Sequence, residues 1–301
     1  VAGGMTDQLG FHDGEIAVQR RAGLHGAAME LVGMLAPPVP SPGRARFLAE
    51  RNFAVLAARD STGRLWTAPL SGPPGFLDLR GDRLAVYALP AGRPEPLPAG
   101  QRVGMIVIDL VTRRRLRVNG RLIQVGPDWF GIVVDQAFGN CQKYIQAREL
   151  RLVPTDTAAG PRPATAAEIA EFAGSTDTFF LGTSHPELGP DASHRGGVPG
   201  FLRVDEAGLW WPDYRGNNMF NSLGNLAVDD SVALLIPDFA AGRMLQVSGT
   251  AVLEWGEPGE PGDDGGTGRR VRLEVAEAVV GGLPVRAEAV EASPANPSVQ
   301  N

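Results

Sequence analysis

The chain has 301 residues, of which 43% are hydrophobic, enough to bury one large core or two of ordinary size. Its net charge is −6 and its arginines are scattered, so no basic stripe follows a phosphate backbone, and we expect no nucleic-acid partner. The single cysteine, Cys141, excludes intramolecular disulfides and multi-cysteine metal sites, and no apolar run approaches the ~20 residues needed to cross a bilayer.

Short strands are predicted along most of the chain, because β-branched or aromatic runs alternate with turn residues. In chain order they cover 53–60, 65–70, 75–79, 84–89, 103–110 and 114–125, then 178–185, 200–204, 208–214, 232–239 and 244–255. Helices are predicted to flank these units over 44–53, 129–153 and 164–180. Thr165 and Glu168 have the spacing of a capping box at the start of the last helix. Many short strands at such spacing are typical of a barrel or sandwich.

An internal duplication relates the two sets of strands. Residues 65–91 align without a gap on 190–216, with Pro74 on Pro199, an offset of 125 residues. Residues 103–125 align on 232–254 with an offset of 129, so the second copy carries four extra residues between the two blocks. Glycines at equivalent places inside regular strand patterns, Gly120 and Gly249, predict a bulge that bends each copy.

The origin and compartment of the chain are suggested by weaker signals. The N-terminus lacks the charged-then-apolar pattern of a secretory signal, so a cytoplasmic protein without membrane contact is expected. Lys143 is the only lysine beside many arginines, alanines and glycines, which suggests a GC-rich bacterial genome.

Five segments carry a resemblance to a known family: "FHDGEIAVQRRAG", "FGNCQKYIQ", "DASHRGG", "WPDYRGNNMFNSLGNL" and "GRMLQVSGTA". Together, over roughly residues 11–256, they resemble the pyridoxamine 5'-phosphate oxidase-like family of FMN-binding split barrels, in the branch that fuses two barrels in one chain. The resemblance implies a mainly β fold of two tandem Greek-key split β-barrels, packed as a pseudo-dimer with FMN between them. Homodimer formation by the whole chain is left open.

The domain organisation expected from this resemblance has four parts. They are an N-terminal extension (1–44), a degenerate first split barrel with its following helix (45–160), a cofactor-binding second split barrel (161–290) and a disordered tail (291–301).

The second copy is expected to hold the cofactor because of the segment 211–226. It places four asparagines and a serine ahead of and inside a short predicted helix, whose N-terminus favours an anion. The corresponding first-copy segment, "VYALPAGRPEPLPAG", is rich in proline and therefore poor in backbone N–H donors. Family members commonly place a basic residue in this helix, and here the charge must come from Arg195, Arg215, Arg243 or Lys143.

The strand "DASHRGG" is the one that the family uses against the flavin ring, although neighbouring side chains in a strand alternate between its faces. Trp211 is expected near the ring and Gln246 at its pyrimidine edge. The candidate cofactor-binding residues are Ser193, His194, Arg195, Trp211, Pro212, Asp213, Tyr214, Asn217, Asn218, Asn221, Ser222, Gln246 and Lys143.

The function implied is that of an FMN-binding oxidoreductase acting on an unidentified small molecule. A deazaflavin or haem user on the same scaffold, and a flavin-binding protein without enzymatic activity, stay open as alternatives. No nucleophile elbow, phosphate loop or dinucleotide-binding motif is present, and the histidines show no zinc-ligand spacing. The sequence names no catalytic residue.

Overall fold

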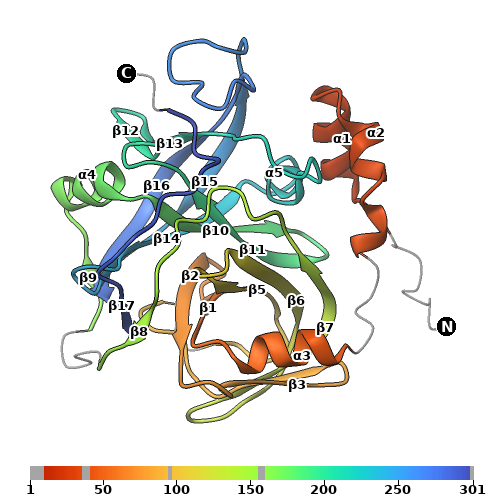
Figure 1. The fold of residues 1–301 in the computed structure, drawn as a ribbon, viewed down its shortest axis with the longest axis vertical. Coiled ribbons are helices and arrows are strands. Elements are labelled where there is room, and N and C mark those ends of the chain that lie inside the picture. The colour runs from red at the N-terminus through yellow and green to blue at the C-terminus, as the bar shows by residue number, and fades with distance from the viewer. Residues whose placement is uncertain (1–9, 36–40, 94–96, 155–159, 299–301) are drawn as a thin grey trace.

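The computed structural model describes residues 10–35, 41–93, 97–154 and 160–298 (Figure 1). Parts of three predicted segments lie outside the described residues: the N-terminal extension, the proline-rich segment of the first copy and the end of the tail. Within the described part of the chain, no helix is both long and apolar enough to cross a bilayer.

Two antiparallel sheets form the body of the molecule. The first has the order β2-β1-β5-β6-β7-β4-β3, made of β1 (Phe53–Arg59), β2 (Leu65–Ser71), β3 (Leu77–Arg80), β4 (Arg83–Val86), β5 (Arg102–Asp109), β6 (Arg114–Val125) and β7 (Phe130–Gly139). The second has the order β11-β10-β14-β15-β16-β13-β12, made of β10 (Thr178–His185), β11 (Gly189–Gly196), β12 (Arg203–Asp205), β13 (Gly208–Pro212), β14 (Ser231–Asp238), β15 (Arg243–Trp255) and β16 (Arg269–Gly282). Three short strands complete the set: β9 (Arg162–Pro163) pairs with β16, and β8 (Arg151–Leu152) pairs with β17 (Val285–Arg286).

The strand order and the register confirm the predicted duplication. Strands β10 to β16 repeat the order of β1 to β7. In β1 and β2, Phe53 faces Ser71, and in β10 and β11, Thr178 faces Gly196, each 125 residues later. The register of β6 on β7 shifts at Asn119/Gly120, and that of β15 on β16 shifts at Ser248/Gly249. The bulges predicted at the two equivalent glycines are therefore present, and the fold is the expected mainly β pair of split barrels.

Each barrel encloses its own apolar core, and a third apolar layer joins the two. This shared layer contains residues of β1 and β5 together with residues of β10 and β14. Phe53 and Phe180 lie at its centre, with ring centroids 5.7 Å apart and no exposed surface. The first barrel thus buries one face of its sheet against the second, as a pseudo-dimer requires.

Helices cover the ends and flanks of the barrels. They are α1 (Asp13–Arg21), α2 (His25–Met29), the 3-10 helix η1 (Val32–Leu35), α3 (Pro42–Ala49), α4 (Ala166–Ser175) and α5 (Asn221–Leu226). The predicted capping box of α4 is confirmed, since Thr165 accepts from the Glu168 amide while Glu168 accepts from the Thr165 amide. Figure 1 shows α1 and α2 beside α5, next to the second barrel.

The prediction of a helix over 129–153 is wrong. Residues Phe130–Gly139 form β7, which lies between β6 and β4, and no helix follows up to Val153. The run "FGIVVDQAFG" contains apolar residues at helical spacing as well as at alternate positions, and pairing with strands on both sides decides between them. Its counterpart β16 was likewise not predicted.

The segment after β17, expected to be a disordered tail from residue 291, makes specific contacts up to Asn296. Glu291 pairs with Ala147 in an isolated bridge, and the Ser293 amide donates to Gln146 Oε1 at 2.7 Å. Asn296 Nδ2 donates to the same oxygen at 3.0 Å. Gln146 is 1% exposed and therefore ties this segment to the chain that follows β7.

Candidate functional site

Two adjoining clefts lie where β6 of the first barrel faces β11 and β13 of the second. The larger encloses about 80 Å³ and the smaller about 60 Å³, and both open to solvent. They share the lining residues Arg117, Arg195, Tyr214, Gly216 and Asn217. Of the candidate residues, the larger is also lined by His194, Trp211 and Pro212, and the smaller by Asp213, Asn218, Asn221 and Ser222.

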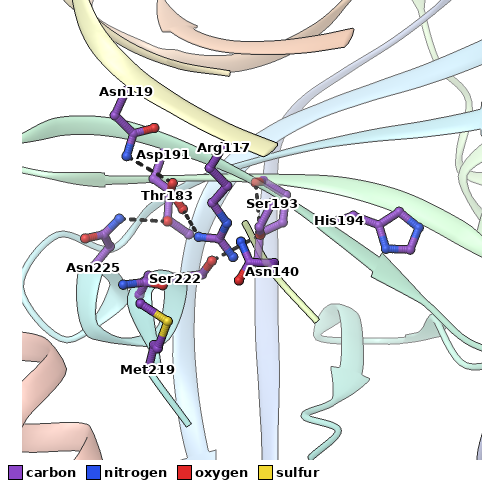
Figure 2. Close-up of polar contacts among 12 residues, drawn as sticks. Arg117, Asn119, Asn140, Thr183, Asp191, Ser193, His194, Met219, Ser222 and Asn225 are labelled. Atoms are coloured by element: carbon purple, nitrogen blue, oxygen red, sulfur yellow. Dashed lines mark hydrogen bonds and ion pairs between the residues drawn. The ribbon is translucent and has the colours of Figure 1, made fainter. Parts of the chain in front are cut away.

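Strand β11 presents its polar side chains to opposite sides, as its alternation requires. Ser193 Oγ lies 3.1 Å from Ser222 Oγ of α5, and Ser193 is 1% exposed. Figure 2 shows the His194 ring pointing away from this group. His194 instead meets Arg115 of β6, whose Nη1 lies 3.0 Å from His194 Nδ1.

Arg115 and Arg117, both on β6, line the clefts and were not among the residues predicted from the sequence. Arg117 Nη1 donates to Asp191 Oδ2 at 2.5 Å, and Asn119 Nδ2 donates to Asp191 Oδ1 at 3.2 Å (Figure 2). Their spacing along a predicted strand could have indicated that the two side chains point to the same side, because residues two apart share one face of a strand. Only the packing of the two barrels reveals that this face meets the second copy.

The protonation of His194 follows from its partner. A guanidinium has no acceptor, so His194 Nδ1 must accept from Arg115. Burial, followed by the nearby guanidinium of Arg115, lowers the pKa of His194 well below its usual value, so the ring is neutral. Its proton is therefore on Nε2. Burial also lowers the pKa of Arg115 to about 9, with the charge of Arg117 acting in the same direction.

Several donors at the clefts lack acceptors. Within the described residues, no hydrogen-bond partner exists for six buried atoms of residues that line the clefts: Arg115 Nε, Arg117 Nε, Arg195 Nε, His194 Nε2, Asn140 Nδ2 and Tyr214 Oη. A buried donor without a partner costs about 1–3 kcal/mol. Three guanidiniums line the larger cleft, and its lining contains no carboxylate among the described residues. This donor set favours an anionic ligand with several acceptor atoms.

Aromatic rings form the remaining walls of the larger cleft. Tyr144 and Tyr214 lie with ring centroids 5.0 Å apart, and Phe201 stacks on Phe179 at 5.4 Å. Trp211 also lines the cleft but is only 2% exposed, because its ring packs into the core of the second barrel. The larger cleft therefore combines apolar walls with charged donors.

The asparagine-rich loop lines the smaller cleft, but two of its side chains already have partners. Asn217 Nδ2 donates to Asn140 Oδ1 at 2.9 Å, whereas Asn221 Nδ2 donates to Glu15 Oε1 of α1. Helix α5 has only six residues and begins after Phe220, which is in a left-handed conformation. Arginines supply the positive charge of this site.

Three of the residues considered as cation sources lie elsewhere. Lys143 is exposed and lines neither cleft. Arg243 pairs with Glu171 at 2.8 Å, and exposed Arg215 donates to Gly266 O at 3.1 Å. Of the four residues considered, only Arg195 lines the clefts.

Gln246 does not reach the clefts, for a reason that the duplication explains. With the offset of 129, Gln246 is the counterpart of Arg117, so it faces the pseudo-equivalent region on the other side of the dimer-like pair. Its Nε2 donates to Thr67 O at 2.7 Å and to Arg93 O at 2.8 Å, and its Oε1 accepts from the Arg93 amide at 3.0 Å.

The pseudo-equivalent region is filled by the first copy's own backbone. A Cβ atom added to Gly92 would lie 2.0 Å from Gln246 Oε1, and Gly92 has a φ of 77° that favours glycine. The Ala91 amide also donates to Pro69 O at 3.0 Å. Of the two regions that the duplication makes equivalent, the Arg117 side carries the two clefts, whereas on the other side Gln246 is hydrogen-bonded to the backbone of Thr67 and Arg93.

Comparisons with known proteins agree with this fold. Residues 165–261 match the family described as pyridoxamine 5'-phosphate oxidase, and no curated protein matches the chain. A candidate pyridoxamine 5'-phosphate oxidase of Lactobacillus delbrueckii is 16% identical, with coverage of 38% of this chain and 93% of that one, at a TM-score of 0.30.

Two further solved structures show similarity at the same level. The haem storage protein HutZ of Vibrio cholerae is 14% identical, with coverage of 42% and 94% and a TM-score of 0.29. A conserved hypothetical protein of Mycobacterium tuberculosis is 19% identical, with coverage of 43% and 84% and a TM-score of 0.26. Similarity this low assigns no ligand to the chain. The second barrel of this chain is thus similar, over residues 165–261, to the family described as pyridoxamine 5'-phosphate oxidase.

Proposed function

We propose that the chain is an FMN-binding oxidoreductase that holds one FMN in the two adjoining clefts between its barrels. The observation that carries the proposal is the group of unpartnered buried donors, which belong to residues that line the clefts. A phosphate ester offers the charge and the acceptor oxygens that such donors need. The aromatic walls of the larger cleft suit a planar ring.

The phosphate end is assigned to the smaller cleft. Three guanidiniums and one carboxylate line it together with neutral polar groups: Arg117, Arg195, Arg269, Asp213, Asn217 and Ser222. Arg117 already has Asp191 as its counter-charge, at 2.5 Å, whereas Arg195 lies 3.8 Å from Asp213. The charge of Arg195 is therefore less neutralised by its partner than that of Arg117, and Arg195 can interact more strongly with an anionic ligand.

The ring end is assigned to the larger cleft, with its tyrosine walls. Bound FMN would supply hydride transfer at N5, and the protein's part is to bind, orient and adjust the ring. Arg115 fixes the His194 tautomer, so that His194 offers a neutral N–H donor. Burial raises the pKa of the Tyr214 phenol, which therefore stays protonated at neutral pH.

Haem binding through His194 is disfavoured by the same contact. A haem-ligating histidine needs a free lone pair on one ring nitrogen. In His194 one lone pair accepts from Arg115 and the other nitrogen carries the proton, so ligation would require the Arg115 contact to break.

The absorbance spectrum of the purified protein, followed by mass spectrometry of the ligand released on heating, tests the cofactor directly. We expect the yellow spectrum of an oxidised flavin and the mass of FMN, at one per chain. A Soret band would indicate haem, and a deazaflavin mass would indicate the other alternative; either would overturn the proposal. Failure of NAD(P)H and other reductants to reduce bound FMN would leave a flavin-binding protein without oxidoreductase activity.

The phosphate assignment is tested by titrating the apoprotein with FMN and with riboflavin, which lacks the phosphate. We expect FMN to bind at least about tenfold more tightly, since charge-assisted hydrogen bonds contribute about 1.5–3 kcal/mol. Arg195→Gln should remove most of this preference. Arg93→Gln, on the filled side of the pseudo-dimer, is the matched control and should keep it. Equal binding of both flavins by the wild-type protein would contradict the assignment.

A further inference from the structure

The loop that lines the smaller cleft holds two residues in a strained backbone conformation. Asn218 has a φ of 61° and Phe220 a φ of 58°, both in the left-handed region. Such a conformation is unfavourable for residues other than glycine, and more so for the bulky Phe220 than for an asparagine. It persists only where surrounding contacts hold it. Those contacts come from the N-terminal segment.

Met219, between the two strained residues, is anchored from behind. Its side chain has no exposed surface and belongs to a cluster made by the N-terminal segment and β7: Phe11, Ala28, Leu35 and Phe138. Gln19 of α1 donates from Nε2 to Met219 O at 3.0 Å, and its Oε1 lies 2.9 Å from His25 Nδ1. Gln19 is itself completely buried, so its amide is committed to this contact.

Glu15 holds the other end of the loop. Helices α1 and α5 approach so closely that a Cβ atom on Gly14 would lie 2.2 Å from Gly224 O. At this contact the Glu15 carboxylate accepts from the Asn221 side chain and, at 2.9 Å, from the His12 amide. Glu15 is only 4% exposed.

We infer that Glu15 and Gln19 are positioning residues of the ligand site, through which helix α1 holds the loop 217–221 in its binding conformation. Neither residue lines the clefts, and each acts through the loop. The inference rests on the proposed function for its ligand, although the effect on the loop can be measured without one.

The charge of Glu15 should make the affinity of the site for an anionic ligand depend on pH. The groups that face it are His12 on its own helix, at 3.7 Å, Asn221 on α5, Asp191 on β11 and Arg117 on β6. Burial raises the pKa of Glu15 to about 7. An anionic ligand binds more tightly when this neighbour is protonated, so affinity for FMN should fall as the pH rises through 7.

The experiment compares full-length Glu15→Leu, Glu15→Gln and Gln19→Leu with Asp13→Asn, which neutralises an exposed carboxylate on the same helix. Hydrogen exchange of 217–221 reports the loop, and that of β14 and β15 reports the barrel. We expect Glu15→Leu and Gln19→Leu to speed exchange in the loop alone and to weaken FMN binding about tenfold, which corresponds to about 1.4 kcal/mol. Asp13→Asn should behave as the wild type.

Glu15→Gln keeps an acceptor for Asn221 but cannot ionise. It should therefore retain most of the FMN affinity at pH 6.5 and lose the decline between pH 6.5 and 8 that the wild-type protein shows. Loop exchange unchanged by Glu15→Leu and Gln19→Leu would overturn the inference, as would identical pH profiles for Glu15→Gln and the wild type. If the wild-type protein binds no FMN, the proposed function fails, and the exchange comparison still decides whether α1 positions the loop.

Discussion

Arg117 Nη1 lies 2.5 Å from Asp191 Oδ2, and this ion pair joins β6 of the first barrel to β11 of the second. Both residues are buried, with 8% and 4% of their surfaces exposed. The same guanidinium lines both clefts, so one residue links the packing of the barrels to the ligand site.

Asp191→Ala should lower the free energy of unfolding by about 3–5 kcal/mol, because it leaves Arg117 buried without its counter-charge. Urea denaturation at pH 7 measures the loss. Asp135→Ala is the control, since Asp135 forms an exposed pair with Arg102 and its removal should cost less than about 1 kcal/mol. Equal losses for the two variants would contradict the role given to the buried pair.

Cys141 offers a direct report of cleft occupancy. It is the only cysteine of the sequence, is half-buried and lines the larger cleft. At an FMN concentration ten times Kd, its reaction with a thiol reagent should slow about tenfold, because about one-tenth of the sites stay free. The same protection should require a higher FMN concentration in Arg195→Gln. An unchanged rate at saturating FMN would place the ligand elsewhere.

The docking of α1 should depend on pH through two buried groups with opposite signs. Burial raises the pKa of Glu15 from its ordinary value of 4.5 to about 7. Protonated Glu15 therefore contributes fully to the stability of docked α1 below pH 4.5, and this contribution is lost as the pH rises to about 7. Burial, and to a smaller extent the nearby His185, lowers the pKa of His12 from 6.5 to about 4. Neutral His12 therefore contributes fully to the stability of docked α1 above pH 6.5, and this contribution is lost as the pH falls towards 4.

Between about pH 4.5 and 6.5 these trends oppose each other, so the stability of docked α1 in the wild-type protein should be nearly constant. Glu15→Gln should lose stability on acidification over this window, and His12→Gln should gain it. Hydrogen exchange of the α1 amides at several pH values measures both. Parallel profiles for the two variants would show that these groups do not control docking.

Gly14→Ala should separate α1 from α5. The added methyl group would meet Gly224 O at 2.2 Å, and backbone atoms cannot move aside as a flexible side chain can. We expect a loss of about 1–3 kcal/mol in thermal or urea unfolding, as for other overpacked contacts. Gly26→Ala in α2 is the control, because no atom lies within 4 Å of its added Cβ, and it should be neutral or stabilising. A neutral Gly14→Ala would mean that the helices do not approach this closely.

The duplication and its bulges could be predicted because they rest on local patterns. Strand periods, turn residues and the offset between Pro74 and Pro199 are all visible along one sequence, and the register of both barrels agrees with them. Strand β7 could not be separated from a helix, since its apolar residues satisfy both periods until neighbouring strands pair with it.

The composition of the site was harder to predict than the fold. The predicted loop contributes Asn217, Asn218, Asn221 and Ser222 to the lining of the smaller cleft, but the partner of Asn221, Glu15, lies 206 residues away in the sequence. Arg115 reaches His194 across the contact between the barrels, which no local pattern reveals. The alternation of residues along β15 predicts that Gln246 points toward the first barrel, but it does not predict which of the two equivalent regions the side chain enters. Gln246 was therefore placed at the clefts, which it does not reach.

Joining the two copies in one polypeptide removes a constraint that binds ordinary homodimers. Two identical subunits must present the same side chain to both of their symmetry-related sites, so a change that closes one closes the other. Here a single gene encodes arginine at position 117 and glutamine at position 246, and each half can specialise alone. Fusion of the two copies thus lets the two regions that a homodimer would keep identical differ in their side chains.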